Sequence, residues 1–263
     1  MEHNARVIWR KDYTPGLWVV RIKPDFEINE AFTPGQYAEL ALDEENGKII
    51  RRQYSIASSP TEKQYYEFAI TRVEGGQVTP NLHRCDLGQT LWINSKIKGK
   101  FSLDHAGVLE NVVFVSTGTG IAPFVSMLRA YGVNGGRWKN AVLINGVRKS
   151  DELLYKAELE NLEHDADGRF TYLPIVSREP GWAAASPAAK HASRKITEGR
   201  VQNVLEPEIY SALVGIELNP ATTQLFLCGN PAMIEDVLSL LGPFGFKEHS
   251  KKDPGHIHLE RYW

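Results

Sequence analysis

Short runs of hydrophobic residues alternate with turn residues along the first hundred positions of the chain. The runs are rich in Val, Ile, Trp, Tyr and Phe, which favour β-strands, and the intervals between them carry Pro-Gly, Asn-Gly and Gly-Gly pairs. Several short strands at this spacing predict an antiparallel barrel or sandwich. We expect its strands over residues 6–10, 17–22, 36–42, 65–71 and 90–97.

The pattern changes after residue 104. Residues 111–116 are continuously apolar, as expected of a strand buried on both faces of a parallel sheet. Beyond them, strand patterns alternate with helix patterns, which predicts a doubly wound parallel α/β domain. Its further strands are expected over 141–147, 170–177, 224–228 and 256–260, and its helices over 121–131, 151–163 and 232–241.

We therefore predict two domains, an antiparallel β-barrel over 1–106 and a doubly wound parallel α/β domain over 107–263. An Ala-, Pro- and Ser-rich stretch over 181–193 interrupts the alternation and is predicted to be a surface insertion.

Composition removes several classes of function. The 263 residues carry a formal net charge of −2, so there is no basic field to attract nucleic acid. The two cysteines, Cys85 and Cys228, cannot hold an iron–sulfur cluster or a four-cysteine zinc site. His256 and His258 would face the same side of the last strand, but without a third ligand nearby we predict no metal site. Without an apolar run of 18 residues or a signal peptide, we expect a cytoplasmic protein that binds no membrane. We also expect it to be a monomer.

The first candidate for binding chemistry is the sequence Ser-Thr-Gly-Thr-Gly-Ile-Ala-Pro at 116–123. It joins the first parallel strand to a helix, at the sheet edge where ligands of such domains bind. Glycines let a ligand approach the backbone, and a helix N-terminus favours an anion. Pro123 replaces the third glycine of the dinucleotide fingerprint and suits a first helical turn. A tight turn without a ligand explains the same letters.

Two further candidates lie in the barrel. Arg52, Tyr54 and Ser55 leave a strand together and offer a cation for a phosphate, a ring for stacking and a hydroxyl for a polar ring edge. The alternative is an ordinary strand end with Tyr54 in the core. Further on, Thr79 and Pro80 predict a helix with Thr79 as its N-cap, and its free N–H groups suit a pyrophosphate. Capping alone also accounts for both residues.

The fourth candidate is the carboxyl end, where residues 258–263 read His-Leu-Glu-Arg-Tyr-Trp. Two aromatic rings in water would leave large apolar surfaces unburied. The tail therefore either packs into the core or stacks on a flat ligand.

The motifs also occur in a distinctive order: Arg-x-Tyr-Ser at 52–55, Gly-x-x-Thr at 76–79, Thr-Gly-Thr-Gly-Ile-Ala-Pro at 117–123, Cys-Gly-Asn-Pro at 228–231 and Glu-x-Tyr-Trp at 260–263. In this order and spacing the chain resembles the bacterial ferredoxin/flavodoxin–NADP(+) reductases over essentially its whole length. The resemblance implies an FAD-dependent oxidoreductase that moves electrons between NADPH and ferredoxin or flavodoxin, by hydride transfer to flavin N5. By the same resemblance, the catalytic residues are Ser55, Cys228, Glu260 and Tyr262.

The resemblance also implies how FAD is held. Arg52 would bind its pyrophosphate with help from the helix at Thr79, while Tyr54 and Tyr262 would cover opposite faces of the flavin. Tyr262 would have to move for nicotinamide to stack, and Trp263 would contact the adenine. The implied FAD residues are Arg52, Gln53, Tyr54, Ser55, Ala69, Ile70, Thr71, Arg72, Gln77, Val78, Thr79, Thr119, Tyr262 and Trp263.

Charge favours NADPH over NADH as the second cofactor. A 2′-phosphate needs arginines, whereas a bare ribose is usually held by an acidic residue at the end of the second strand. Here Arg148 and Arg178 end the second and third strands, and Arg200 resembles a further phosphate-binding arginine, with Arg194 or Lys195 as substitutes. The implied NADP(H) residues are Gly118, Gly120, Val147, Arg148, Ser177, Arg178, Arg200, Cys228, Gly229 and Asn230.

Two alternatives stay open on the sequence. One is an NAD(P)H-dependent flavoreductase component of an oxygenase system. The other is a flavin-binding electron-transfer subunit that does not use NADPH itself.

Overall fold

The computed structural model describes residues 2–28, 32–43, 49–103, 109–133, 137–182 and 199–261. The chain forms two compact units. The first comprises Met1–His105 and Ala122–Ala130, and the second comprises Ala106–Ile121 and Tyr131–Trp263.

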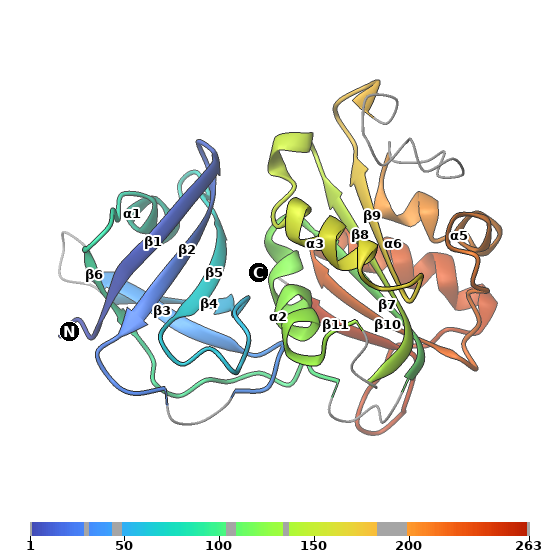
Figure 1. Ribbon diagram of the computed structural model, residues 1–263, viewed down its shortest axis with the longest axis horizontal. Coiled ribbons are helices and arrows are strands. Elements are labelled where there is room, and N and C mark those ends of the chain that lie inside the picture. Colours follow the sequence, from blue (N-terminus) through green and yellow to red (C-terminus); the bar gives the residue numbers. More distant parts are fainter. Residues whose placement is uncertain are drawn as a thin grey trace. The chain divides into compact units, whose positions relative to one another are not determined.

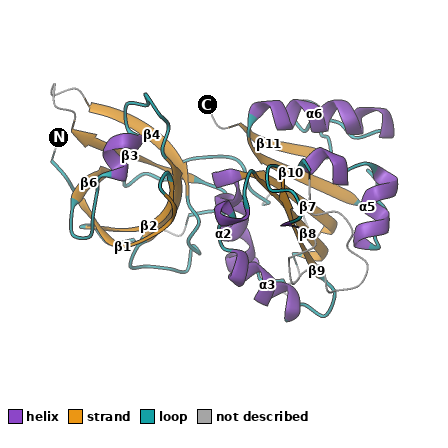
Figure 2. Ribbon diagram, turned by 90° about the horizontal axis from the view of Figure 1, so that it is seen from above, coloured by secondary structure: helices purple, strands orange, loops and turns teal. Residues whose placement is uncertain are grey.

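The first unit contains a six-stranded antiparallel sheet in the order β4-β3-β6-β1-β2-β5. The sheet curves into a barrel (Figure 2), and a bridge between Ile56 and Phe68 joins the chain after β4 to β5. Its elements are β1 (Ala5–Thr14), β2 (Leu17–Pro24), β3 (Tyr37–Asp43), β4 (Ile49–Ser55), β5 (Tyr66–Thr71), α1 (Thr79–His83), β6 (Thr90–Ile93) and most of α2 (Ala122–Tyr131).

Alternating apolar residues build the core of this barrel. Trp18, Leu40 and Phe68 are fully buried in it, and Tyr54 packs against the same cluster from a half-buried position. The last strand, β6, is shorter than the predicted 90–97. It ends because the Asn94 side chain accepts the N–H of Lys96, an Asx turn that redirects the chain.

The second unit contains a five-stranded parallel sheet in the order β11-β10-β7-β8-β9. Figures 1 and 2 show α3 on one face of this sheet and α5 and α6 on the other. The elements are β7 (Leu109–Thr117), β8 (Trp138–Val147), α3 (Lys156–His164), β9 (Phe170–Val176), α5 (Pro207–Val214), β10 (Thr223–Gly229), α6 (Pro231–Leu241) and β11 (Ile257–Arg261).

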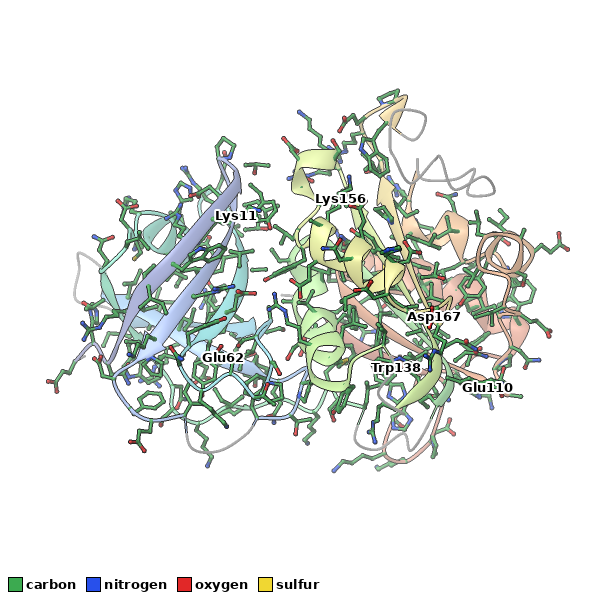
Figure 3. The ribbon with its side chains drawn as sticks, viewed as in Figure 1. Lys11, Glu62, Glu110, Trp138, Lys156 and Asp167 are labelled. Carbon is green, nitrogen blue, oxygen red and sulfur yellow. The ribbon has the colours of Figure 1, made fainter. Side chains whose placement is uncertain are left out.

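The strand order places a topological switch between β7 and β10, because the chain runs outward from β7 through β8 and β9 and then returns to β10. In such sheets ligands bind at the carboxyl ends of the strands flanking the switch. Glu110 and Trp138, labelled in Figure 3, mark the opposite, amino ends of β7 and β8. The predicted glycine loop and the segment after Cys228 therefore both follow strands at the switch.

The helices of the second unit differ from the prediction in two places. The helix predicted over 151–163 begins only at Lys156, because Tyr155 adopts a left-handed conformation with φ of 58°. Residues 150–152 form a separate 3-10 turn. Helix α5 was not predicted, although Pro207 in its first turn and the left-handed Gly215 after its end are standard signals.

Candidate functional site

Strand β4 carries the Arg-x-Tyr-Ser motif at one edge of the barrel sheet. Arg52 and Gln53 are exposed, Tyr54 is half-buried and Ser55 is buried. The Tyr54 ring meets Phe68 edge-on, with centroids 6.5 Å apart. Its hydroxyl is buried and has no hydrogen-bond partner among the described residues, and burial raises the pKa of this phenol well above its ordinary value. A buried hydroxyl of this kind fits a polar group of a bound molecule.

Strand β5 forms the other edge and offers its backbone to a ligand. Glu67 points its N–H at Ser58 Oγ (3.2 Å) and its carbonyl at the N–H of Ala57 (2.8 Å), both away from β2. Because backbone groups alternate along an antiparallel strand, those of Ala69 and Thr71 point to the same outer edge. The bridge between Ile56 and Phe68 already pairs the N–H of Ala69 with the chain after β4, so the Ala69 carbonyl and the backbone groups of Thr71 are the ones that face the polar edge of a flat ring such as a flavin.

Helix α1 differs from its prediction at Thr79. Val78 occupies the N-cap position, and Thr79 is the first helical residue. The Thr79 hydroxyl instead accepts the N–H of Val73 at 2.9 Å and closes the loop that contains Gly75 and Gly76. The prediction of Thr79 as N-cap was wrong, because a backbone donor of the preceding loop takes its side-chain oxygen. Among its predicted neighbours, Gln77 is exposed and Val78 is buried.

In the second unit, the loops after β7 and β10 touch backbone to backbone. A Cβ on Gly120 would lie 2.3 Å from the carbonyl oxygen of Cys228, and one on Gly229 (φ +139°) would lie 2.2 Å from Thr117 Oγ1. The same Thr117 oxygen accepts the N–H of Asn230 at 2.9 Å. Both positions therefore require glycine.

For Gly118, by contrast, no heavy atom of the described residues beyond its own chain neighbours lies within 4 Å of where its Cβ would be. The backbone there can be approached closely, as a dinucleotide requires. Next along the loop, Thr119 belongs to the 3-10 turn Gly118–Ile121 that leads into α2. At the neighbouring loop, the Asn230 side chain caps α6 by accepting the N–H of Ala232 at 2.8 Å.

Two of the predicted catalytic residues lie together at the same edge. Cys228 on β10 is in register with Glu260 on β11 and with Ser116 on β7. Its Sγ lies 3.6 Å from Glu260 Oε2, so the thiol donates to the carboxylate. Cys228 is fully buried and Glu260 is half-buried. Ser55 belongs to the other unit, and Tyr262 and Trp263 lie outside the described residues.

The three predicted arginines gather at the carboxyl ends of β8 and β9. Backbone bonds from Arg178 to Arg148 (2.8 Å) and from Gly199 to Val176 (3.0 Å) bring the segments together, and Arg200 follows Gly199. Ser177 donates through its hydroxyl to the Val147 carbonyl at 3.1 Å. All three arginines are exposed. Arg194, Lys195 and nearly all of the predicted insertion lie outside the described residues.

Two side chains near this cluster were missed at the level of sequence. Glu152 binds the guanidinium of Arg148 at 2.7 Å and also accepts its backbone N–H. Glu179 accepts both the N–H and the hydroxyl of Ser150, and these hydrogen bonds lower the pKa of its carboxyl. The four-residue spacing of Arg148 and Glu152 could have indicated their ion pair, but side chains at this spacing meet only where the chain turns.

The predicted histidine pair has other partners. His258 Nε2 lies 3.0 Å from Gln224 Oε1, and its ring stacks between Phe226 and His249. His256 Nδ1 accepts the N–H of Lys247. Within the described ranges, no group of three His, Cys, Asp or Glu side chains is arranged to hold a metal ion.

Comparison with known proteins agrees with this division into two cofactor sites. Residues 22–102 match the family model of the oxidoreductase FAD-binding domain, and residues 114–239 match that of the oxidoreductase NAD-binding domain. The fold and the sites therefore define an FAD- and NAD(P)-binding oxidoreductase, which confirms both cofactor predictions and both fold classes.

The chain belongs to the flavodoxin/ferredoxin–NADP reductase family. It is 32% identical to the flavodoxin/ferredoxin–NADP reductase of Buchnera aphidicola subsp. Schizaphis graminum, over 99% of this chain and 98% of the relative. The Escherichia coli reductase of the same description is 31% identical over 88% of each chain. A ferredoxin NADP+ reductase from Neisseria gonorrhoeae, solved with bound FAD and NADP, superposes with a TM-score of 0.83 at 25% identity, covering 98% of this chain and 97% of its own.

These similarities fit the predicted reductase better than the oxygenase-component or electron-transfer-subunit alternatives. No helix in the described part of the chain is long and apolar enough to cross a membrane.

Proposed function

We propose that this reductase moves electrons between NADPH and a ferredoxin or flavodoxin, with FAD held by residues 1–106 and NADP(H) by residues 107–263. The observation that carries the proposal is the pairing of Cys228 with Glu260 beside the glycine loop at the switch of the parallel sheet. Bound FAD supplies the chemistry, because it accepts a hydride from NADPH at N5 and releases the two electrons singly to the protein partner.

On the flavin side, Arg52 is the proposed pyrophosphate ligand. Among the described residues, its guanidinium donates to the neighbouring Arg51 carbonyl at 2.9 Å. Tyr54 would hold one face of the ring, with Ser55 beside it and the outer edge of β5 along its polar side. Two arguments support this set, the buried Tyr54 hydroxyl and the outward-facing Ala69 carbonyl and Thr71 backbone groups.

On the nicotinamide side, Gly118 and Thr119 would receive the ring, and Cys228 and Glu260 would line its pocket. The buried Cys228 thiol donates to the Glu260 carboxylate, so it contributes a small, protonated side chain that excludes water. A Cys228→Ala or Glu260→Gln substitution should slow flavin reduction by NADPH, measured by stopped-flow bleaching, and leave FAD content unchanged. An unaltered rate in both variants would remove these two residues from the mechanism.

The preference for NADPH rests on Arg148, Arg178 and Arg200, which converge at the ends of β8 and β9. We expect kcat/KM to be higher with NADPH than with NADH. Equal values for the two coenzymes would contradict the assignment of these arginines. An Arg178→Ala variant should raise KM for NADPH and leave KM for NADH unchanged, so that the kcat/KM values for the two coenzymes come closer together.

Tyr262 is proposed to cover the flavin face on which nicotinamide stacks and to move aside when it binds. Aromatic overlap of this kind is worth about 1 kcal/mol, small enough to be displaced. Deleting residues 262–263 and titrating with NADP(+) tests the role, and unchanged affinity, flavin spectrum and hydride rate would refute it.

Ferredoxin and flavodoxin are the proposed partners on the strength of the family. The assay is NADPH oxidation by the purified protein with ferredoxin or flavodoxin as acceptor, at low and high salt. Turnover with neither carrier would refute the proposed partner class.

A further inference from the structure

A buried carboxylate near the start of β5 binds two arginines. Glu67 on β5 is 1% exposed, and its two oxygens lie 2.7 Å from Arg21 Nε and 2.7 Å from Arg129 Nη1. Arg21 comes from β2, and its guanidinium lies between the rings of Trp9 (4.6 Å) and Tyr65 (4.7 Å). Arg129 comes from α2, which belongs to the same compact unit.

The two arginines differ in the other hydrogen bonds that they make. Arg129 Nη1 also donates to the carbonyl of Ala57 at 2.9 Å, whereas Arg21 Nε donates to the carboxylate of Glu67. One turn earlier on α2, the buried Ser126 hydroxyl donates to the carbonyl of Ser58 at 2.8 Å. Helix α2 thus binds two successive carbonyls of the segment that follows Ser55.

Glu67 fixes the same segment from the other side. Its backbone carbonyl accepts the N–H of Ala57, and its backbone N–H donates to the Ser58 hydroxyl. Just before this, the N–H of Ile56 donates to Gln36 at 3.0 Å. Both Ala57 and Ser58 are buried, so their polar groups find these partners inside the protein and not in water.

We propose that Arg129, together with Glu67, is a positioning residue for the reaction: it fixes residues 56–58 and thereby the side chains of Tyr54 and Ser55 at the flavin. The inference rests on the proposed function, because it assumes that Tyr54 and Ser55 contact the flavin. A buried ion pair is a weak source of stability, since the desolvation of its charges offsets their attraction. Retaining three charges at this place is explained better by the geometry they impose than by the stability they add.

The test compares Arg129→Met with Arg21→Met in the FAD-loaded protein. Each substitution breaks one of the two ion pairs of Glu67, so both are expected to destabilise the barrel, but only the first releases the Ala57 carbonyl. Arg129→Met should speed hydrogen exchange in a peptide spanning 55–59 and slow flavin reduction by NADPH about tenfold, because small displacements of reacting groups are costly. Arg21→Met should leave the exchange over 55–59 and the rate of flavin reduction near the parent values. Arg129→Lys should restore part of the exchange protection and part of the rate that Arg129→Met loses.

Equal changes in exchange and in rate for Arg129→Met and Arg21→Met would overturn the proposal and leave the cluster a purely structural one. Unchanged exchange over 55–59 in Arg129→Met would also overturn it. Ser55→Ala separates this outcome from a failure of the proposed function: if that variant reduces flavin at the parent rate, Ser55 has no catalytic role. The exchange measurement still decides whether Arg129 fixes the segment.

Discussion

Removing the hydroxyl of Ser116 should destabilise the parallel sheet by an amount that the structure sets. Ser116 and Asn145 face each other from β7 and β8, both fully buried, and Ser116 Oγ donates to Asn145 Oδ1 at 3.0 Å. In Ser116→Ala the amide oxygen loses this donor in a place that water does not reach. An unpaired buried acceptor costs about 2 kcal/mol, which corresponds to a fall in Tm of roughly 4–8 °C for a chain of this size.

Thermal unfolding followed by circular dichroism measures this loss. Ser211→Ala is the matched control, because the hydroxyl of the half-buried Ser211 donates to the Pro207 carbonyl of its own helix at 2.7 Å, and its loss should change Tm little. The double variant Ser116→Ala, Asn145→Leu removes donor and acceptor together and should lose less than the sum of the two single changes. A Tm for Ser116→Ala within about 1 °C of the parent would refute the reasoning, as would strict additivity.

Three further predictions concern backbone packing, coenzyme binding and alkaline pH. Gly120→Ala should cost about 1–3 kcal/mol and weaken NADP(+) binding, since its methyl group would meet the Cys228 carbonyl; unchanged binding by titration would contradict this. Glu152→Gln frees Arg148 from an exposed ion pair worth about 0.2–1 kcal/mol, so KM for NADPH should fall up to about fivefold, and a rise would oppose the assignment. Burial raises the pKa of Tyr54, Tyr172 and Tyr210, so the stability gained by keeping them neutral is complete below about pH 10 and is lost as pH rises further. Ultraviolet absorbance should show these phenols ionising only as the protein unfolds; their titration in the folded state would contradict it.

The periodic parts of the chain were predictable because local sequence determines them. Continuous apolar runs gave the parallel strands, and Pro-Gly and Gly-Gly pairs marked the barrel turns. The misses have particular causes. The left-handed Tyr155 delays α3, and the Asn94 side chain ends β6, yet neither residue type demands that conformation. Threonine is a favoured N-cap residue, but the Thr79 hydroxyl oxygen accepts the N–H of Val73 and does not cap the helix.

The candidate site, like the fold, could be predicted from the sequence only in part. Its residues were found through motifs and resemblance, and the glycines at 118, 120 and 229 were expected where backbone must come close. The partners of those residues depend on strand register and on long-range contacts. Glu67 and Arg129 are 62 positions apart, and no local pattern pairs them. The bond between Arg148 and Glu152 likewise depends on the turn between them.

The outer edge of β5 has a consequence for handling the protein. The bridge at Phe68 pairs the strand only as far as the N–H of Ala69, and the Ala69 carbonyl and the backbone groups of Thr71 face outward. An open strand edge is a template for pairing with another chain. A preparation that has lost its flavin would therefore be prone to self-association through this edge, and excess FAD during purification and storage should suppress aggregation.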